Sequence, residues 1–195
     1  GGGLGYVGQY HVSAMKQLLD DRAKLVTIEP RYPYRLNANG ELETVNYREL
    51  PIPVEDLPES PNFEYEVHVK GKPVTAQVFR GKNKLGIEAY LIEDKDDYYT
   101  KMLYRYGQYG TARWDEFSEF FSLAALELMH KIEYKNMDEL GRDWKAPVAI
   151  ANEGQLGLFS VFRKIYAYHT PDKISKGALS WFVTHTYPNR GVYER

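Results

Sequence analysis

Alternating apolar and polar side chains form the clearest pattern in this sequence, and they lie in its middle third. Three runs show a period of two: 63–70, 74–80 and 87–92. That period is typical of strands that bury one face. Gly71-Lys72 and a loop at 81–86 separate the runs with turn-forming residues. We therefore predict a three-stranded antiparallel β-meander over 63–92.

Apolar side chains also recur at helical spacing in three places. These segments are 10–20, 114–132 and 155–168. Each carries an apolar stripe of the kind that an amphipathic helix buries. One more helical turn is predicted over 136–140, and Gly141 is its expected stop.

Short β runs complete the predicted sheet. They lie at 24–29, 147–151 and 179–185. The last two flank a predicted helix, and strand, helix, strand at this spacing indicates a crossover with parallel pairing. Residues 30–61 hold most of the prolines and read as a long, mostly irregular excursion. The predicted class is α/β: a Rossmann-like, mostly parallel sheet with helices on both faces and the meander inserted in it.

Composition excludes several classes of protein. The 195 residues, of which 43% are hydrophobic, suit one domain or one lobe of a larger enzyme. A formal charge of −2 offers no basic surface for nucleic acid or an anionic membrane. The absence of cysteine rules out disulfides and cysteine zinc sites. We expect a cytoplasmic protein with no membrane or nucleic-acid partner and no cofactor. The sequence leaves the oligomeric state open, and a homo-oligomer is one possibility.

Tyrosine is abundant, with 17 residues. Tyrosines can fill half-buried positions of strands and helices, and most of these lie inside such regular patterns. A tyrosine ring can also stack on the CH face of a sugar while its hydroxyl donates a hydrogen bond. The first interpretation is favoured from the sequence, and the second stays open.

The glycines at the start of the chain are the first candidate site. Gly2, Gly3 and Gly5 precede a predicted helix, where backbone N–H groups and the helix N-terminus attract phosphate. The strand that should precede such a turn is missing, so we expect a trimmed N-terminus or an incomplete stretch of a longer protein. An expression scar or a flexible tail explains the glycines equally well.

Two predicted strand ends supply the other candidates, because ligands gather at the carboxyl ends of parallel strands. Asn152, Glu153 and Gln155 follow one strand and suit hydrogen bonding to sugar hydroxyls, although Asn152 and Gln155 also resemble a helix capping box. His185 ends the other strand, before Thr186 and Tyr187, and can donate to a phosphate or hydroxyl. A structural histidine bonded to backbone is the alternative for His185.

The other histidines are expected at the surface, and none pairs with another at metal-ligand spacing: His11, His68, His130 and His169. We therefore predict no metal site. The acidic run Asp94-Lys95-Asp96-Asp97 is most simply a solvated turn.

Taken in order, seven short motifs resemble the N-terminal lobe of bacterial glycogen synthases and plant starch synthases, which belong to the two-lobed GT-B class of glycosyltransferases. The motifs are Gly2-Gly3-Leu4-Gly5-Tyr6-Val7-Gly8, Pro30-Arg31-Tyr32, Ala89-Tyr90-Leu91-Ile92-Glu93-Asp94, Leu103-Tyr104, Phe120-Phe121-Ser122-Leu123-Ala124-Ala125-Leu126-Glu127, Ile150-Ala151-Asn152-Glu153-Gly154-Gln155-Leu156-Gly157-Leu158 and Thr184-His185-Thr186. Each is modest alone, but the ordered series covers nearly the whole chain.

The resemblance implies that residues 1–195 form the acceptor-side lobe of a retaining hexosyltransferase. Such an enzyme transfers glucose from ADP-glucose or UDP-glucose to the 4-hydroxyl of an α-1,4-glucan, and a C-terminal donor lobe binds most of the nucleotide sugar. Asn152, Glu153 and His185 would take the catalytic places. The implied substrate-binding residues are Gly2, Gly3, Gly5, Tyr104, Gln155, Thr186 and Tyr187.

Departures from the family pattern leave other functions open. Asn152 stands where the family has its active-site histidine, and asparagine cannot carry a proton. The family's lysine before the glycines and the second lobe are absent from these 195 residues, so the chain alone is expected to be inactive. The alternatives are a non-catalytic glucan-binding or scaffolding module and, less favoured because of the meander, a sucrose- or trehalose-type enzyme.

Overall fold

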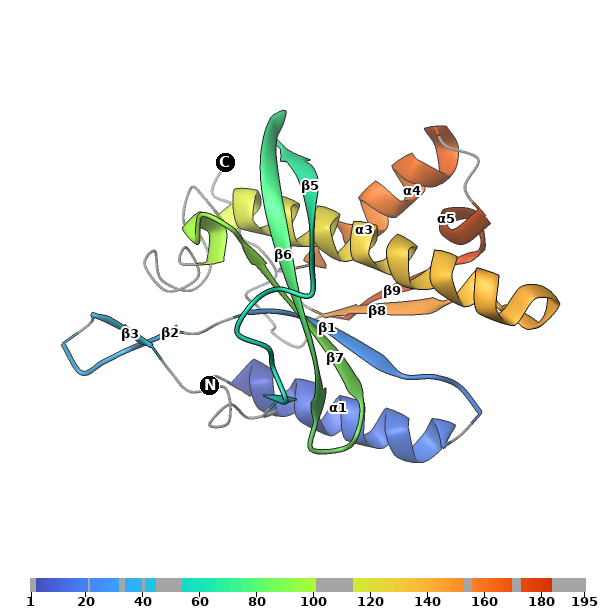
Figure 1. Cartoon of the computed structure of the whole chain (residues 1–195), viewed down its shortest axis with the longest axis horizontal. Coiled ribbons are helices and arrows are strands. Elements are labelled where there is room, and N and C mark those ends of the chain that lie inside the picture. Colours follow the sequence, from blue (N-terminus) through green and yellow to red (C-terminus); the bar gives the residue numbers. More distant parts are fainter. Residues whose placement is uncertain are drawn as a thin grey trace. The chain divides into compact units, whose positions relative to one another are not determined.

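The fold was obtained as a computed structural model, which describes residues 3–20, 22–31, 34–39, 41–44, 54–100, 114–152, 156–169 and 173–183 (Figure 1). The chain divides into two compact units. Unit 1 consists of Gly1–Glu66 and Thr75–Gln108, and unit 2 consists of Val67–Val74 and Tyr109–Arg195. Each unit is described below by itself.

A five-stranded mixed sheet lies mostly in unit 1, and residues 67–74, at the β5–β6 turn, belong to unit 2. Its strands are β1 (Val26–Pro30), β4 (Val54–Glu55), β5 (Phe63–Val69), β6 (Lys72–Asn83) and β7 (Glu88–Asp94). The order is β1-β7-β6-β4, and β5 also pairs with β6. The three alternating runs of the sequence are thus strands that pair in chain order. In this sheet only the β1–β7 pair is parallel among the registers of the described strands, so the sheet is mixed and not mostly parallel.

One cluster of core residues in unit 1 lies on a single face of this sheet. Phe79 and Leu91 are register partners on β6 and β7, and both are almost fully buried with Ala89 and Val54. β4 crosses close to β6 at Gly81, where an added Cβ would lie 2.7 Å from both the Glu55 carbonyl oxygen and Val54 Cγ1. Only glycine allows that approach without moving the backbone of β4.

The segment 30–61, predicted as mostly irregular, contains a small hairpin. β2 (Tyr34–Leu36) pairs antiparallel with β3 (Leu42–Thr44). Asn37 closes the turn, because its Oδ1 accepts hydrogen bonds of 2.9 Å from the backbone N–H groups of Asn39 and Glu41. The prediction missed this hairpin because its strands are short and its turn depends on one side chain.

Helix α1 (Gly3–Leu19) also belongs to unit 1 and begins earlier than predicted. Gly3 and Gly5 lie in its first turns, whereas the sequence placed them in a loop before a helix starting near residue 10. None of the helices in the described part of the chain is long and apolar enough to cross a membrane.

Unit 2 is built around the long helix α3 (Trp114–Leu140), which contacts α4 (Phe159–His169) and α5 (Lys173–Gly177) (Figure 1). α3 includes the turn predicted at 136–140, and Gly141 follows with a φ of +54° at the start of the 3-10 turn η2 (Gly141–Asp143). Strands β8 (Val148–Asn152) and β9 (Leu179–Val183) pair in parallel, which confirms the predicted crossover. The short helix α5 was not predicted.

The tip of the β5–β6 hairpin packs within unit 2. Lys70 and Gly71 both have positive φ, which is the requirement of a two-residue turn that follows the twist of its strands. The Lys70 N–H donates to Glu119 of α3 at 2.8 Å, and its ammonium lies 3.0 Å from Asp115. The first turns of α3 therefore fix the tip by direct hydrogen bonds.

Candidate functional site

The carboxyl ends of β8 and β9 form the first candidate edge. The two strands run parallel and Asn152 is in register with Val183, so both strands end at the same side of the pair. The parallel pairing of the two strands is as predicted. Most of the residues predicted at this edge lie outside the described residues: Glu153, Gln155, His185, Thr186 and Tyr187.

The structure describes only some of the other predicted site residues. The backbones of Gly3 and Gly5 form the first turns of α1, while Gly2 and Tyr104 lie outside the described residues. The N-terminus of α1 keeps the backbone N–H groups on which an anion site depends. Because α1 belongs to unit 1 and Asn152 to unit 2, Gly3 and Asn152 are treated as separate candidate sites.

A second carboxyl edge lies in unit 1, where the parallel strands β1 and β7 end. Arg31 directly follows β1, and its backbone N–H donates to the Ile92 carbonyl at 2.7 Å. Its guanidinium forms an ion pair of 2.5 Å with Glu93 and lies over the Phe79 ring at 3.7 Å from the centroid. Only 19% of the Arg31 side chain and 14% of the Glu93 side chain are exposed, so most of the pair is shielded from water.

Burial governs the ionisation of the carboxyl groups at this edge. Burial raises the pKa of Glu93. The positive charge of Arg31 opposes this rise, and the negative charges of Asp97 and Asp94 add to it. Burial also raises the pKa of Glu29, which lies two residues before Arg31 and thus on the same face of β1. A guanidinium with two carboxyl groups offers donors and acceptors for a hydroxyl-rich or phosphorylated ligand.

Sequence reasoning did not single out Arg31 and Glu93 as site residues, although Glu93 directly follows one predicted β run and Arg31 lies two residues after the end of another. Their signal was the same as that of Asn152 and His185: a polar side chain at a strand's carboxyl end. Arg31 and Glu93 come together only because β1 pairs with β7, and the two residues are 62 positions apart in the sequence. The alternation within each strand does not indicate which strand pairs with which.

Asp94 corrects the prediction of a solvated turn. Asp96 is exposed as expected, but Asp94 is only 2% exposed. Its carboxylate accepts hydrogen bonds from the backbone N–H of Tyr98 at 2.6 Å and from the N–H and hydroxyl of Thr100 at 2.9 Å each. Asp94 therefore caps the helical turn at 98–100 and acts as a structural residue.

His130 is a second correction. It was predicted at the surface, but it is 5% exposed and its Nε2 lies 2.7 Å from the hydroxyl of the fully buried Ser175. The reason is that α4 and α5 pack on this part of α3, a contact between segments that the apolar stripe alone did not indicate. His68 and His169 are exposed and His11 is half-buried. Within the described ranges, no three histidine, aspartate or glutamate side chains are grouped so that they could hold a metal ion.

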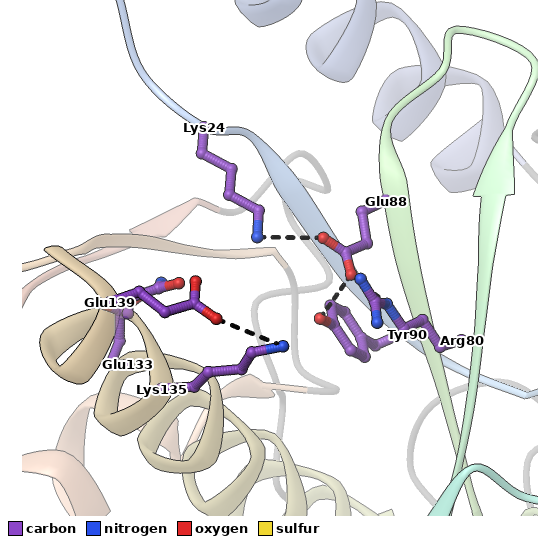
Figure 2. A network of polar contacts seen from close by, with 8 residues as sticks. Lys24, Arg80, Glu88, Tyr90, Glu133, Lys135 and Glu139 are labelled. Atoms are coloured by element: carbon purple, nitrogen blue, oxygen red, sulfur yellow. Dashed lines mark hydrogen bonds and ion pairs between the residues drawn. The ribbon is translucent and has the colours of Figure 1, made fainter.

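A charged network stabilises the opposite, amino-terminal end of β1 and β7 (Figure 2). Glu88 forms ion pairs with Lys24 at 3.2 Å and with Arg80, and it accepts a hydrogen bond of 2.7 Å from the Tyr90 hydroxyl. Burial opposes the ionisation of Glu88, but these partners outweigh it and lower its pKa. Because the charged and polar groups of this network bond one another, we assign it a structural role. The Lys135–Glu139 ion pair in the same figure belongs to α3.

Comparison with known proteins supports the fold. The chain is similar to a solved structure of the catalytic domain of starch synthase IV from Arabidopsis thaliana bound to ADP and acarbose, with a TM-score of 0.56 and 21% sequence identity. The likeness covers 90% of this chain but only 29% of that one. No protein-family model and no curated protein matches the chain. At this identity the likeness concerns the fold alone, and it supports a glycosyltransferase-like fold.

Proposed function

We propose that the chain is the acceptor-side N-terminal lobe of a retaining glycosyltransferase of the glycogen or starch synthase type. It would take part in the transfer of glucose from ADP-glucose or UDP-glucose to the 4-hydroxyl of an α-1,4-glucan. The observation that carries the proposal is the structural likeness over 90% of the chain, which spans 29% of a starch synthase catalytic domain. The ordered series of short motifs in the sequence supports it independently.

The proposed chemistry is electrostatic and positional. Asn152, Glu153 and His185 would bind sugar hydroxyls and the departing diphosphate at the β8–β9 edge, where the two strands end together. Gln155, Thr186, Tyr187 and Tyr104 would position the acceptor. Gly2, Gly3 and Gly5 at the N-terminus of α1 would contribute backbone N–H groups to the diphosphate.

Two partners belong to this proposal. A C-terminal donor lobe would bind the nucleotide, and closure of the two lobes would exclude water from the transfer. The donor is a substrate, so the reaction needs no separate cofactor. A cytoplasmic location fits the expected substrates.

Titration with maltotetraose tests the acceptor role. We expect millimolar maltotetraose to shift the backbone amide signals of Asn152 and Val183, because these residues end the two paired strands. Cellotetraose, with β-1,4 linkages, is the matched control ligand and should shift them less. Asn152→Ala should weaken the response, while Asn136→Ala on α3 should leave it unchanged. Unchanged signals at Asn152 and Val183 in maltotetraose would contradict acceptor binding at this edge.

A non-catalytic glucan-binding or scaffolding module is the second candidate, and Asn152 favours it because asparagine cannot transfer a proton. The reading frame downstream of these residues separates the two. A following α/β lobe with basic residues and paired glutamates supports the enzyme, and an unrelated or absent lobe supports the module.

A further inference from the structure

The turn of the β2–β3 hairpin carries an asparagine whose side chain is not held by hydrogen bonds. Asn39 is exposed, and its side-chain amide makes no hydrogen bond with the residues that the structure describes. Its backbone N–H, in contrast, donates to Oδ1 of Asn37 at 2.9 Å, as the N–H of Glu41 does. Asn37 therefore fixes the backbone of the turn, while the amide group of Asn39 stays free to rotate.

The residue after Asn39 is glycine, and this is the one Asn-Gly pair in the sequence. A glycine has no Cβ to shield its backbone nitrogen, and it reaches backbone conformations that other residues seldom adopt. The nitrogen of Gly40 can therefore approach Cγ of Asn39 more readily than the nitrogen of a larger residue could. Attack of the following backbone nitrogen on that carbon is the first step by which an asparagine loses its amide group.

Four other asparagines in the described ranges differ from Asn39 in both respects. Each has a side chain that makes a hydrogen bond and a next residue that is not glycine: Asn37, Asn62, Asn83 and Asn136. Asn62, for example, accepts a hydrogen bond of 2.6 Å from the N–H of Arg80 and is followed by Phe63. Compared with these four, only Asn39 combines an unbonded amide with a following glycine.

We propose that Asn39 is a site of spontaneous, backbone-mediated deamidation. The Gly40 nitrogen attacks Cγ of Asn39, and the new carbon–nitrogen bond closes a succinimide ring. The bond from Cγ to the amide nitrogen breaks, and this nitrogen leaves as ammonia with the proton that the Gly40 nitrogen gives up. Water then opens the ring at one of its two carbonyl carbons, which yields aspartate or isoaspartate at position 39. The reaction uses water alone as co-reactant, and it does not depend on the proposed function.

Isoaspartate at this position would disrupt the closure of the hairpin. Its main chain runs through the former side-chain carbon, so one extra backbone atom separates the N–H of residue 39 from that of Glu41. Oδ1 of Asn37 accepts from both of these N–H groups and cannot keep both bonds after the insertion. Leu36 and Leu42 are the register pair nearest the turn, and β2 and β3 form a sheet of two strands, which is marginally stable by itself. Deamidation should therefore loosen the pairing of β2 with β3.

Ageing of the full chain tests this site. The chain is incubated at mildly alkaline pH, where the attacking nitrogen loses its proton more readily, and its peptides are then sequenced by mass spectrometry. We expect Asn39 to gain the mass that marks conversion of an amide to a carboxyl group at least about tenfold faster than Asn62 or Asn136, since a small difference in barrier gives a large difference in rate. An isoaspartyl methyltransferase should methylate the aged chain. Gly40→Ala should slow the reaction about tenfold, because the added Cβ shields the nitrogen.

Two further variants keep the inference falsifiable if Gly40→Ala disturbs the turn. Asn39→Gln, whose longer side chain would have to close a larger ring, should abolish the mass gain in this peptide, whereas Asn136→Gln should leave the rate at Asn39 unchanged. A mass gain that persists in Asn39→Gln would place the reaction at Asn37 and overturn the inference. Equal rates at Asn39 and Asn62 would overturn it as well. In the aged chain the Glu41 amide signal should shift, and an unshifted signal after full methylation would refute the loss of the closing bonds.

Discussion

Replacing Asp94 by alanine removes the acceptor of three hydrogen bonds at the end of β7. The backbone N–H of Thr100, its hydroxyl and the N–H of Tyr98 all donate to this carboxylate at 2.6 to 2.9 Å. Both Asp94 and Thr100 are almost fully buried, so water cannot readily replace the lost partner. The helical turn at 98–100 should lose its cap, and the end of β7 should loosen with it.

The magnitude follows from the donors left without an acceptor. A buried donor that loses its partner costs about 1–3 kcal/mol, and bonds to a charged acceptor lie in the upper part of that range. Tyr98 is partly exposed and can recruit water, so the two Thr100 donors dominate. We expect Asp94→Ala to lower the free energy of unfolding of unit 1 by about 3 kcal/mol, a large share of the stability of a typical domain. Asp94→Asn keeps one carbonyl oxygen as an acceptor and should cost about half as much.

Urea unfolding measured on unit 1 is the assay. All three tryptophans, Trp114, Trp144 and Trp181, lie in unit 2, so their fluorescence reports that unit and serves as an internal control. Far-UV circular dichroism and amide hydrogen exchange at 88–92 report unit 1. With a denaturant slope of about 1–3 kcal/mol per M, the midpoint in urea should fall by at least about 1 M. The Thr100 amide should exchange much faster than in the original chain.

Asp96→Ala is the matched control, because it removes an exposed carboxylate from the same acidic run. It should change the stability of unit 1 by less than about 0.5 kcal/mol. Equal midpoints for Asp94→Ala and Asp96→Ala, with unchanged protection of the Thr100 amide, would show that the cap contributes nothing.

Three further predictions follow from glycine geometry, the buried histidine and a buried carboxyl. Gly81→Ala should destabilise unit 1 by about 2–3 kcal/mol in the same urea assay, because the added Cβ would overlap the backbone of β4. Gly86→Ala is the control: Gly86 has a φ of +72° and open space around it, so the substitution should cost only about 1 kcal/mol. Ser175→Ala should lower the stability of unit 2 by about 1–3 kcal/mol, read by tryptophan fluorescence, because it leaves His130 Nε2 without this partner; a Ser175→Ala midpoint equal to that of the original chain would contradict this. Burial raises the pKa of Glu29 in the folded state above its value in the unfolded state, so between these two pKa values the folded state binds more protons and the stability of unit 1 falls as pH rises. Glu29→Gln should make stability depend less on pH in this interval and raise the urea midpoint at neutral pH. A pH profile equal to that of the original chain would refute this assignment.

The sequence predicted the local elements better than their partners. Alternation over 63–92 located β5, β6 and β7, and helical spacing located α3, because these patterns depend on one buried face of each element. The β8–β9 parallel pair was also predictable, since a single helix-containing crossover joins the two strands.

Long-range packing explains what the sequence could not reveal. His130 looks like a surface residue on a helical wheel until α4 and α5 cover it, and Asp94 looks solvated until Thr100 folds back onto it. The opening glycines are poor helix formers, yet they form the first turns of α1, so tertiary context overrides their propensity. The sequence predicted the candidate sites only as the ends of strands. The Arg31–Glu93 ion pair could not be predicted, because it depends on the pairing of β1 with β7.

The parallel pairing of β1 with β7 has a consequence for how quickly the chain reaches its native state. The hairpin β6–β7 closes a short loop, whereas joining β1 to β7 closes a loop of about 60 residues, and the entropy of that closure must be lost before any contact compensates for it. We expect β1 to dock late, after the antiparallel strands have formed. Until then the open edge of β7 is exposed to strands of other molecules, so refolding yield should fall as protein concentration rises.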